Sequence, residues 1–178
     1  FLTRIEKNSK HLLSLINDLL DISKLERKGL ILSDVDAYKV VNDAVDACML
    51  AAKKKNLELR VCQELEEFTI KAHERTLLQV LLNLLSNAIK FTHDGYIELC
   101  CLQQNSNFVI TVKDTGRGIP KEKIDKIFEA FEQSQEGDEG TGLGLKLVKD
   151  MCEAMNIKIN VESEEGVGTT FSLFAAKV

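Results

Sequence analysis

Two asparagines and a lysine lie on one side of an otherwise apolar segment, "QVLLNLLSNAIKFT". Asn83, Asn87 and Lys90 are spaced i, i+4 and i+7, so a helix would present all three on the same face. Asparagine is a mediocre helix former and is costly to desolvate without partners, so this pair requires an explanation. One interpretation is that the amide oxygens face a hydrated Mg²⁺ while Lys90 neutralises phosphate. The other is an ordinary solvated stripe, and this segment alone leaves both open.

A second candidate is "VKDTGRGIP", which follows a predicted strand. Gly116 and Gly118 permit backbone conformations and close ligand approach that a side chain would block. Asp114, at the strand end, offers a carboxylate suited to the exocyclic amine of adenine, and Ile119 offers an apolar wall. The alternative is a plain strand-to-helix turn, because a short G-x-G is weak evidence by itself.

A third candidate is "EGTGLGLKLVK", in which Gly140, Gly142 and Gly144 precede and enter a predicted helix. Backbone amides at a helix N-terminus form an anion site, so phosphates would be favourable there. The spacing differs from the P-loop and from the dinucleotide-binding G-x-G-x-x-G pattern, which disfavours both of those folds. In the intervening "IFEAFEQ" we expect Phe128 and Phe131 to anchor the following loop in the core.

The periodicity of apolar residues predicts the elements that position these candidates. We expect helices over residues 2–25, 37–54, 74–91, 121–130 and 143–155, and strands over 30–35, 57–63, 68–72, 96–104, 107–114, 157–163 and 170–178. The order lacks regular βαβα alternation. It favours an α+β fold, a two-layer α/β sandwich with a mixed, mainly antiparallel sheet and helices on one face. The leading bundle helix would form a separate unit, residues 1–29, ahead of a domain over 30–178.

Composition argues against nucleic-acid-binding, membrane-spanning and disulfide-rich classes of protein. The chain has 178 residues, 44% of them hydrophobic, enough for a substantial core, and its net charge of -5 disfavours nucleic-acid binding. No apolar run approaches the length of a membrane span, so we expect no membrane contact. The five cysteines show no C-x-x-C spacing, which argues for a reducing compartment rather than a disulfide framework or a zinc site. Because the chain opens with Phe1 inside a helical pattern, we interpret it as a piece of a longer protein.

Taken in order, "NLLSNAIKFT", "DTGRGIP", "IFEAF" and "GTGLGL" resemble the N, G1, F and G2 boxes of the ATP-binding domain of sensor histidine kinases. That domain has the Bergerat-type fold of the gyrase, Hsp90, histidine kinase and MutL superfamily. The resemblance spans about residues 33–178, and the leading helix is similar to the second helix of the family's dimerisation and histidine-phosphotransfer domain. It implies that the cofactors are ATP and Mg²⁺. The implied nucleotide-binding residues are Asn83, Asn87, Lys90, Phe91, Asp114, Gly116, Gly118, Ile119, Gly140, Thr141, Gly142, Leu143, Gly144 and Leu145.

The resemblance also implies individual roles. Asn87 would coordinate Mg²⁺ with Asn83 beside it, Lys90 would contact phosphate, Phe91 would pack near the nucleotide, and Asp114 would bind the adenine amine. Gly140, Gly142 and Gly144 would form the hinge of an ATP lid. The MutL, Hsp90 and gyrase branch has a water-activating glutamate at the position of Asn83, and an amide cannot act as that base. The kinase branch is therefore the better match, and an ATPase is disfavoured.

The phosphoaccepting histidine of that family lies in a motif resembling S-H-E-[LI]-R-T-P-L. His11 is followed by Leu12, Leu13 and Ser14, so we expect the phosphoacceptor to lie outside this chain. The implied function is transfer of the ATP γ-phosphoryl group to that histidine, then to an aspartate of a response regulator. The implied partners are a receiver domain, the parent's own dimerisation domain and a second copy of the chain. The implied location of this chain is the cytoplasm.

Three departures from the family pattern keep an alternative open. The lid "EQSQEGDE" is short and acidic, His73 stands where relatives often place an aspartate N-cap, and Glu139 replaces a frequent glycine. The alternative function is a catalytically degenerate module of the same fold that binds nucleotide or acts as a scaffold.

Overall fold

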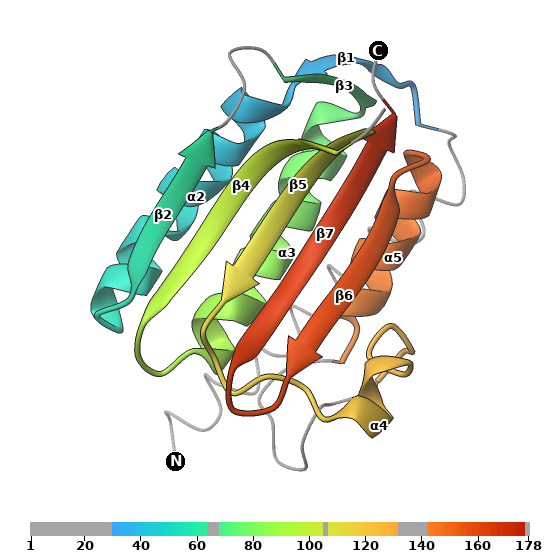
Figure 1. The fold of residues 1–178 in the computed structure, drawn as a ribbon. Coiled ribbons are helices and arrows are strands. Elements are labelled where there is room, and N and C mark those ends of the chain that lie inside the picture. The colour runs from blue at the N-terminus through green and yellow to red at the C-terminus, as the bar shows by residue number, and fades with distance from the viewer. Residues whose placement is uncertain (1–29, 64–67, 105–106, 132–141, 177–178) are drawn as a thin grey trace, which may run out of the picture.

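The structure, a computed structural model, describes residues 30–63, 68–104, 107–131 and 142–176. Figure 1 shows two layers, a twisted sheet in front and helices α2, α3 and α5 behind it, all on the same face. This arrangement confirms the predicted α+β sandwich. The predicted leading helix, and with it the proposed unit 1–29, lies outside the described residues and stays a prediction. Within those residues no helix has the length and hydropathy to cross a bilayer.

The elements follow the predicted order. The helices are α2 (Ala37–Lys54), α3 (Glu74–Phe91), α4 (Lys121–Ile124) and α5 (Gly144–Ala154). The strands are β1 (Ser33–Asp36), β2 (Glu58–Gln63), β3 (Thr69–Ala72), β4 (Tyr96–Gln104), β5 (Asn107–Asp114), β6 (Lys158–Glu164) and β7 (Gly168–Ala176).

The main sheet has the strand order β2-β4-β5-β7-β6. Strand β2 pairs with β4 in parallel, and the other three pairings are antiparallel. Strands β1 and β3 form a separate antiparallel pair. The sheet is therefore mixed and mainly antiparallel, as the sequence predicts.

One face of the sheet is buried against the helices because apolar residues alternate along the strands. In β4, Ile97, Leu99 and Cys101 are buried while the residues between them are half-exposed. Helix α3 lies between α2 and α5 and buries one apolar side, which consists of Leu77, Val80, Leu81, Leu84, Leu85, Ala88 and Ile89. The polar stripe runs along the edge of this buried side.

Side chains cap the two long helices at their first turns. Asp36 accepts hydrogen bonds from the backbone N–H groups of Tyr38, at 3.0 Å, and Lys39, at 3.2 Å. His73 fills the same position for α3, because its Nδ1 accepts from the backbone N–H of Thr76 at 3.3 Å. The histidine therefore acts as the N-cap of α3.

Several predictions about local structure are wrong. The first strand begins at Ser33 rather than residue 30, and helix α4 ends at Ile124, after which turns continue to Phe131. Phe128 packs edge-on against Phe171 with ring centroids 6.4 Å apart, as expected of a core residue. Phe131, however, is 68% exposed with a φ of 65°, so it does not anchor the following loop in the core. A three-residue spacing keeps two side chains together only while the helix continues.

Candidate functional site

The polar stripe of α3 lies between the buried side of the helix and solvent. Asn83, Asn87 and Lys90 are all half-buried, whereas an ordinary solvated stripe would be exposed. The amide nitrogen of Asn83 is buried and has no hydrogen-bond partner among the described residues. Burying an amide nitrogen without an acceptor is unfavourable for folding. A bound ligand that accepts its hydrogen bond would remove this cost.

Lys55, just after α2, holds the C-terminal end of α3. Its ammonium donates to the carbonyl oxygens of Ile89, at 2.7 Å, Lys90, at 2.9 Å, and Thr92, at 3.4 Å. The last carbonyls of a helix have no partner within the helix, and a cation there is also favoured by the helix dipole. Lys55 thereby fixes the helical turn that carries Lys90 and Phe91.

The loop after β5 lies directly on this helix end. The backbone N–H of Arg117 donates to the carbonyl oxygen of Phe91 at 3.3 Å. A Cβ at Gly116 would lie 2.6 Å from that same oxygen, so only glycine permits the contact. The close approach made by Gly116 is therefore to the protein backbone, and it brings Asp114 beside the end of the asparagine-bearing helix.

The other side of the loop rests on the β6–β7 turn. Gly118 has a φ of +70°, and a Cβ there would lie 2.0 Å from the carbonyl oxygen of Glu164. The N–H of Gly166 donates to the carbonyl of Arg117 at 2.7 Å, and the N–H of Ile119 donates to Ser163 Oγ at 2.8 Å. The buried Ile119 is thus held in place from a distant part of the sequence.

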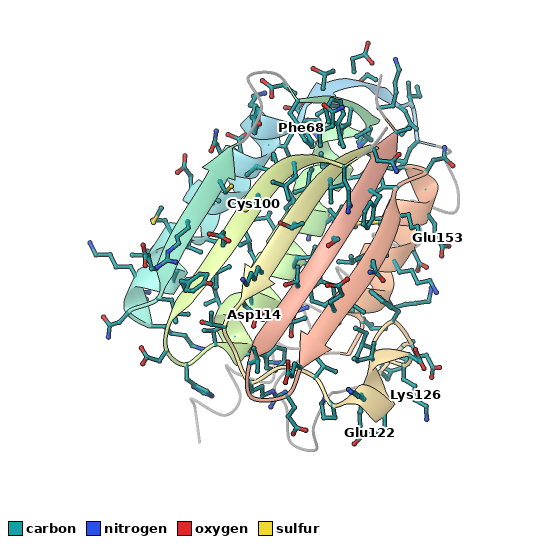
Figure 2. The ribbon with its side chains drawn as sticks, in the orientation of Figure 1. Phe68, Cys100, Asp114, Glu122, Lys126 and Glu153 are labelled. Atoms are coloured by element: carbon teal, nitrogen blue, oxygen red, sulfur yellow. The ribbon has the colours of Figure 1, made fainter. Side chains whose placement is uncertain are left out.

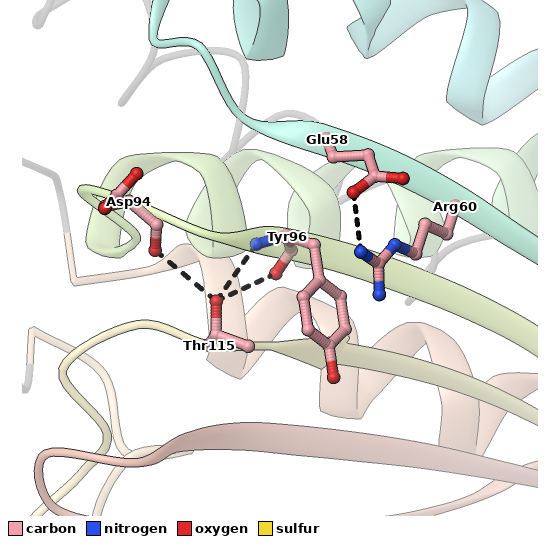
Figure 3. A network of polar contacts seen from close by, with 5 residues as sticks. All are labelled: Glu58, Arg60, Asp94, Tyr96 and Thr115. Carbon is pink, nitrogen blue, oxygen red and sulfur yellow. Dashed lines mark hydrogen bonds and ion pairs between the residues drawn. The ribbon is translucent and has the colours of Figure 1, made fainter.

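Thr115 joins the loop to the start of β4, as Figure 3 shows. Its Oγ1 accepts from the N–H of Tyr96 at 3.0 Å and lies 3.2 Å from the Tyr96 carbonyl and 3.5 Å from that of Asp94. Lys55, Thr115 and Ser163 are positioning residues that the sequence patterns did not indicate. Each acts on a segment far away along the chain, so no local signal could have found them.

Asp114 is the buried carboxylate of the site, only 7% exposed. Burial raises its pKa, and hydrogen bonds from the backbone N–H groups of Gly116 and Thr169 oppose that rise. The Gly116 bond measures 2.8 Å to Oδ1. A carboxylate has about four lone-pair sites, so capacity remains for a further donor such as an aromatic amine.

Two cations lie on the ring of Phe91. The Lys90 ammonium is 4.4 Å from the ring centroid, and the Arg117 guanidinium is 4.5 Å from it. Cation–π attraction holds both groups near the half-buried ring. Two positive charges at one place raise the local potential and favour an anionic ligand.

The third predicted segment is described only in part, since Gly140, Thr141, Glu139 and the acidic lid lie outside the described residues. Gly142 has a φ of 69°, and its carbonyl accepts from the N–H of Phe131 at 2.9 Å. Leu143 is buried, and Gly144 and Leu145 begin α5. The ends of the predicted lid are thus joined by one backbone hydrogen bond, and the anion site at α5 stays a prediction.

The donor set suits a magnesium ion that keeps its water. Within the described ranges no cluster of three or more histidine, cysteine or acidic side chains could hold a metal. The side-chain oxygens that the polar stripe offers to a metal are those of the amides of Asn83 and Asn87. Mg²⁺ is the cation that uses few protein ligands and retains several waters.

Comparison with known proteins agrees with this geometry. Residues 72–177 match the family described as "Histidine kinase-, DNA gyrase B-, and HSP90-like ATPase". The chain is 34% identical over 97% of its length to "Hybrid signal transduction histidine kinase B" of Dictyostelium discoideum, and 34% identical over 96% to "Sensor protein GacS" of Pseudomonas syringae pv. syringae. It spans only 9% and 20% of these two relatives.

Solved structures give the same result. Full-length ShkA in complex with AMPPNP matches 99% of this chain with a TM-score of 0.85 and 32% identity, and the match covers 38% of that protein. The catalytic domain of histidine kinase ThkA matches 83% of this chain with a TM-score of 0.74 and 25% identity, over 97% of that domain. Because the family match covers more than half of its residues, the chain belongs to the histidine kinase-, DNA gyrase B- and HSP90-like ATPase family.

Proposed function

We propose that this chain is the ATP- and Mg²⁺-binding catalytic domain of a two-component sensor histidine kinase. In the intact protein it would donate the ATP γ-phosphoryl group to a histidine outside the chain, for relay to a response-regulator aspartate. The observation that carries the proposal is the contact between the Phe91 carbonyl and the Gly116–Arg117 backbone. This contact places the buried carboxylate of Asp114 beside the end of α3, the helix that carries the two asparagines and Lys90.

Each group has a chemical task in this proposal. Asp114 would accept the adenine amine, while Ile119 and the Phe91 ring would contact the base, with Gly116 and Gly118 keeping the loop close. Asn87 would bind Mg²⁺ with Asn83 beside it, and Lys90 would contact phosphate. The segment from Gly140 to Leu145 would carry the lid hinge. ATP with its Mg²⁺ supplies the transferable phosphoryl group, so the chain contributes mainly positioning and charge neutralisation.

A kinase is supported over a hydrolase by the chemistry of Asn83. Its neutral amide cannot take a proton from water, so the site lacks at that position the general base that hydrolysis would use. The similarity to a hybrid signal transduction histidine kinase and to a sensor protein supports the same choice. A receiver domain and a dimerisation domain, with residues 1–29 as part of the latter, are the partners this function requires.

Calorimetric titration of the chain with ATP and Mg²⁺ tests nucleotide binding. We expect binding in the micromolar range, which an Asn87→Ala, Asp114→Asn double variant loses. Labelled ATP tests transfer: the chain alone should not become phosphorylated, whereas addition of a dimerisation domain that carries its histidine should yield acid-labile phosphohistidine. Binding without any transfer would support the degenerate module instead. Absence of binding would leave only the scaffold interpretation.

A further inference from the structure

Two cysteines far apart in the sequence are direct neighbours in the sheet. Strands β2 and β4 run in parallel, and their register pairs Cys62 with Cys100. Adjacent strands lie about 4.8 Å apart, and a disulfide requires Cα atoms about 4.4 to 6.8 Å apart. The backbone of this pair is therefore already at a spacing that an S–S bond can bridge.

The two thiols lie on the same, open face of the sheet. Burial alternates along β4, so Cys101 lies in the core among the helices and Cys100 lies on the opposite face, half-exposed. Figure 2 shows Cys100 on β4. Arg60 of β2 stacks diagonally on Tyr96 of β4, 3.9 Å from the ring centroid, so alternate residues of the two strands share this face. Cys62 is two residues beyond Arg60 and is also half-exposed.

Cys100 has a neighbour on each side within the sheet. Its register partners are Cys62 on β2 and Thr111 on β5. Burial, together with the Cys62 contact, raises the pKa of Cys100 to about 12. Cys100 therefore stays protonated at neutral pH. Strand β2 is the edge strand, so Cys62 is the thiol that a reagent in solution reaches first.

We propose that Cys62 and Cys100 form a redox-active dithiol that closes to a disulfide when it meets a low-molecular-weight disulfide such as oxidised glutathione. The Cys62 thiolate attacks one sulfur of that reagent, and a mixed disulfide forms as the first glutathione thiolate leaves. Cys100 then loses its proton to solvent as its sulfur attacks the Cys62 sulfur, and the second glutathione thiolate leaves. The protein gives up two electrons and two thiol protons, and both protons end on the two glutathione thiols released.

The bond would act on the edge of the sheet. Within the described sheet, β2 pairs only with β4. The disulfide would add a covalent link to the backbone hydrogen bonds that join these two strands. A link between two residues this far apart also restricts the unfolded chain. We therefore expect oxidation to raise the midpoint of thermal unfolding and to slow fraying of β2.

The test is mass spectrometry of the 178-residue chain after incubation with oxidised glutathione, acid quenching and alkylation. We expect a loss of two hydrogens and a tryptic cross-link between the peptides that carry Cys62 and Cys100, reversed by dithiothreitol. Tandem fragmentation and a Cys101→Ala variant assign the bond to Cys100 rather than its neighbour. Cys48, Cys101 and Cys152, which are buried, should become alkylated only after denaturation.

Two variants complete the design. Cys100→Ser should stop at a mixed glutathione disulfide on Cys62, and Cys62→Ser should give no cross-link and no shift of the unfolding midpoint on oxidation. The proposal is overturned if wild-type protein accumulates the mixed disulfide without closing, if both thiols stay reduced, or if the cross-link joins another cysteine. None of these outcomes depends on nucleotide binding, so they are independent of the proposed kinase function.

Discussion

Arg117 and Phe91 are joined twice. The backbone N–H of Arg117 donates to the Phe91 carbonyl at 3.3 Å, and the guanidinium of Arg117 lies 4.5 Å from the centroid of the Phe91 ring. The first contact fixes the loop on the end of α3, and the second orients the ring. Loop and helix therefore behave as one rigid unit, and changes in either should affect both stability and nucleotide binding.

Gly118 and Gly166 provide a matched pair of substitutions to alanine. Both have positive φ, +70° and +80°, but only at Gly118 would a Cβ strike the backbone, 2.0 Å from the Glu164 carbonyl oxygen. We expect Gly166→Ala to lower the free energy of unfolding by about 1 kcal/mol, from strain alone. Gly118→Ala should lower it by roughly 3 kcal/mol or more. Urea unfolding measures both, and equal losses would contradict the described packing of the loop on the β6–β7 turn.

Asp114→Asn should weaken ATP binding about tenfold or more, because an amide is a poorer acceptor than a carboxylate for an amine donor. Protonation of the Asp114 carboxylate should also weaken ATP binding. In wild-type protein the affinity for ATP should therefore fall as the pH is lowered through the raised pKa of Asp114. Calorimetry across the acidic range measures this. Asp46→Asn, on the exposed side of α2, is the control and should change nothing.

The same carboxyl group predicts a pH dependence of stability. Because burial raises its pKa above 3.8, the folded state binds the Asp114 proton more tightly than the unfolded chain does. The free energy of unfolding therefore loses this contribution as the pH rises from 3.8 through the folded pKa. Asp114→Asn should remove that part of the decline in urea unfolding curves. If the free energy of unfolding of Asp114→Asn falls with pH as much as that of wild-type protein, other titrating groups cause the decline.

Asn87→Ala should abolish the dependence of nucleotide affinity on Mg²⁺, since the amide oxygen is the expected protein ligand of the ion. Titrations of ATP with and without Mg²⁺ should then give nearly the same affinity. Ser86→Ala is a matched control, because Ser86 is exposed on a different side of the same helix. A retained Mg²⁺ effect in Asn87→Ala would move the metal role to another residue, with Asn83 the first to test.

Lys55→Met should destabilise the domain by about 1 to 2 kcal/mol, because three carbonyls lose a charged donor. It should also weaken nucleotide binding, since the end of α3 carries Lys90. Lys54→Met, the preceding residue, should cost less than about 0.5 kcal/mol. Equal effects of the two substitutions would mean that Lys55 acts only through the dipole of α2.

Phe131→Gly should stabilise the domain by about 1 kcal/mol, because glycine adopts a φ of 65° without strain. The exposed ring contributes little burial, and the backbone bond to Gly142 survives the substitution. Phe131→Ala removes the ring but keeps the strain, so thermal unfolding should show no such gain. Equal gains in both variants would attribute the effect to the ring instead.

Periodicity predicted the elements well where one face is buried. Helix α3 and strands β4 and β5 have the bounds expected from the sequence, because strict spacing of apolar residues determines which side enters the core. It failed at Phe131, where the helix ends early and the three-residue spacing no longer holds the two rings together.

The candidate site was predictable only in its local parts. Asp114 and the asparagines were singled out by type and spacing, and their roles stay predictions. Lys55 and Ser163 act through hydrogen bonds to segments more than thirty residues away. Gly116 was assigned to ligand approach, and its contact in the structure is with the Phe91 carbonyl. Such contacts depend on the tertiary arrangement, which no short pattern encodes.

Helix α2 and strand β2 lie ahead of the segment that matches the family, which begins at residue 72. Yet β2 covers the edge of β4, α2 packs on α3, and Lys55, just after α2, supplies the ammonium that caps the end of α3. A gene fragment trimmed to the boundary of the family match would leave β4 as a bare edge, ready to pair with other chains. We therefore expect a stable fragment to include α2 and β2 in addition to the segment by which the family is recognised.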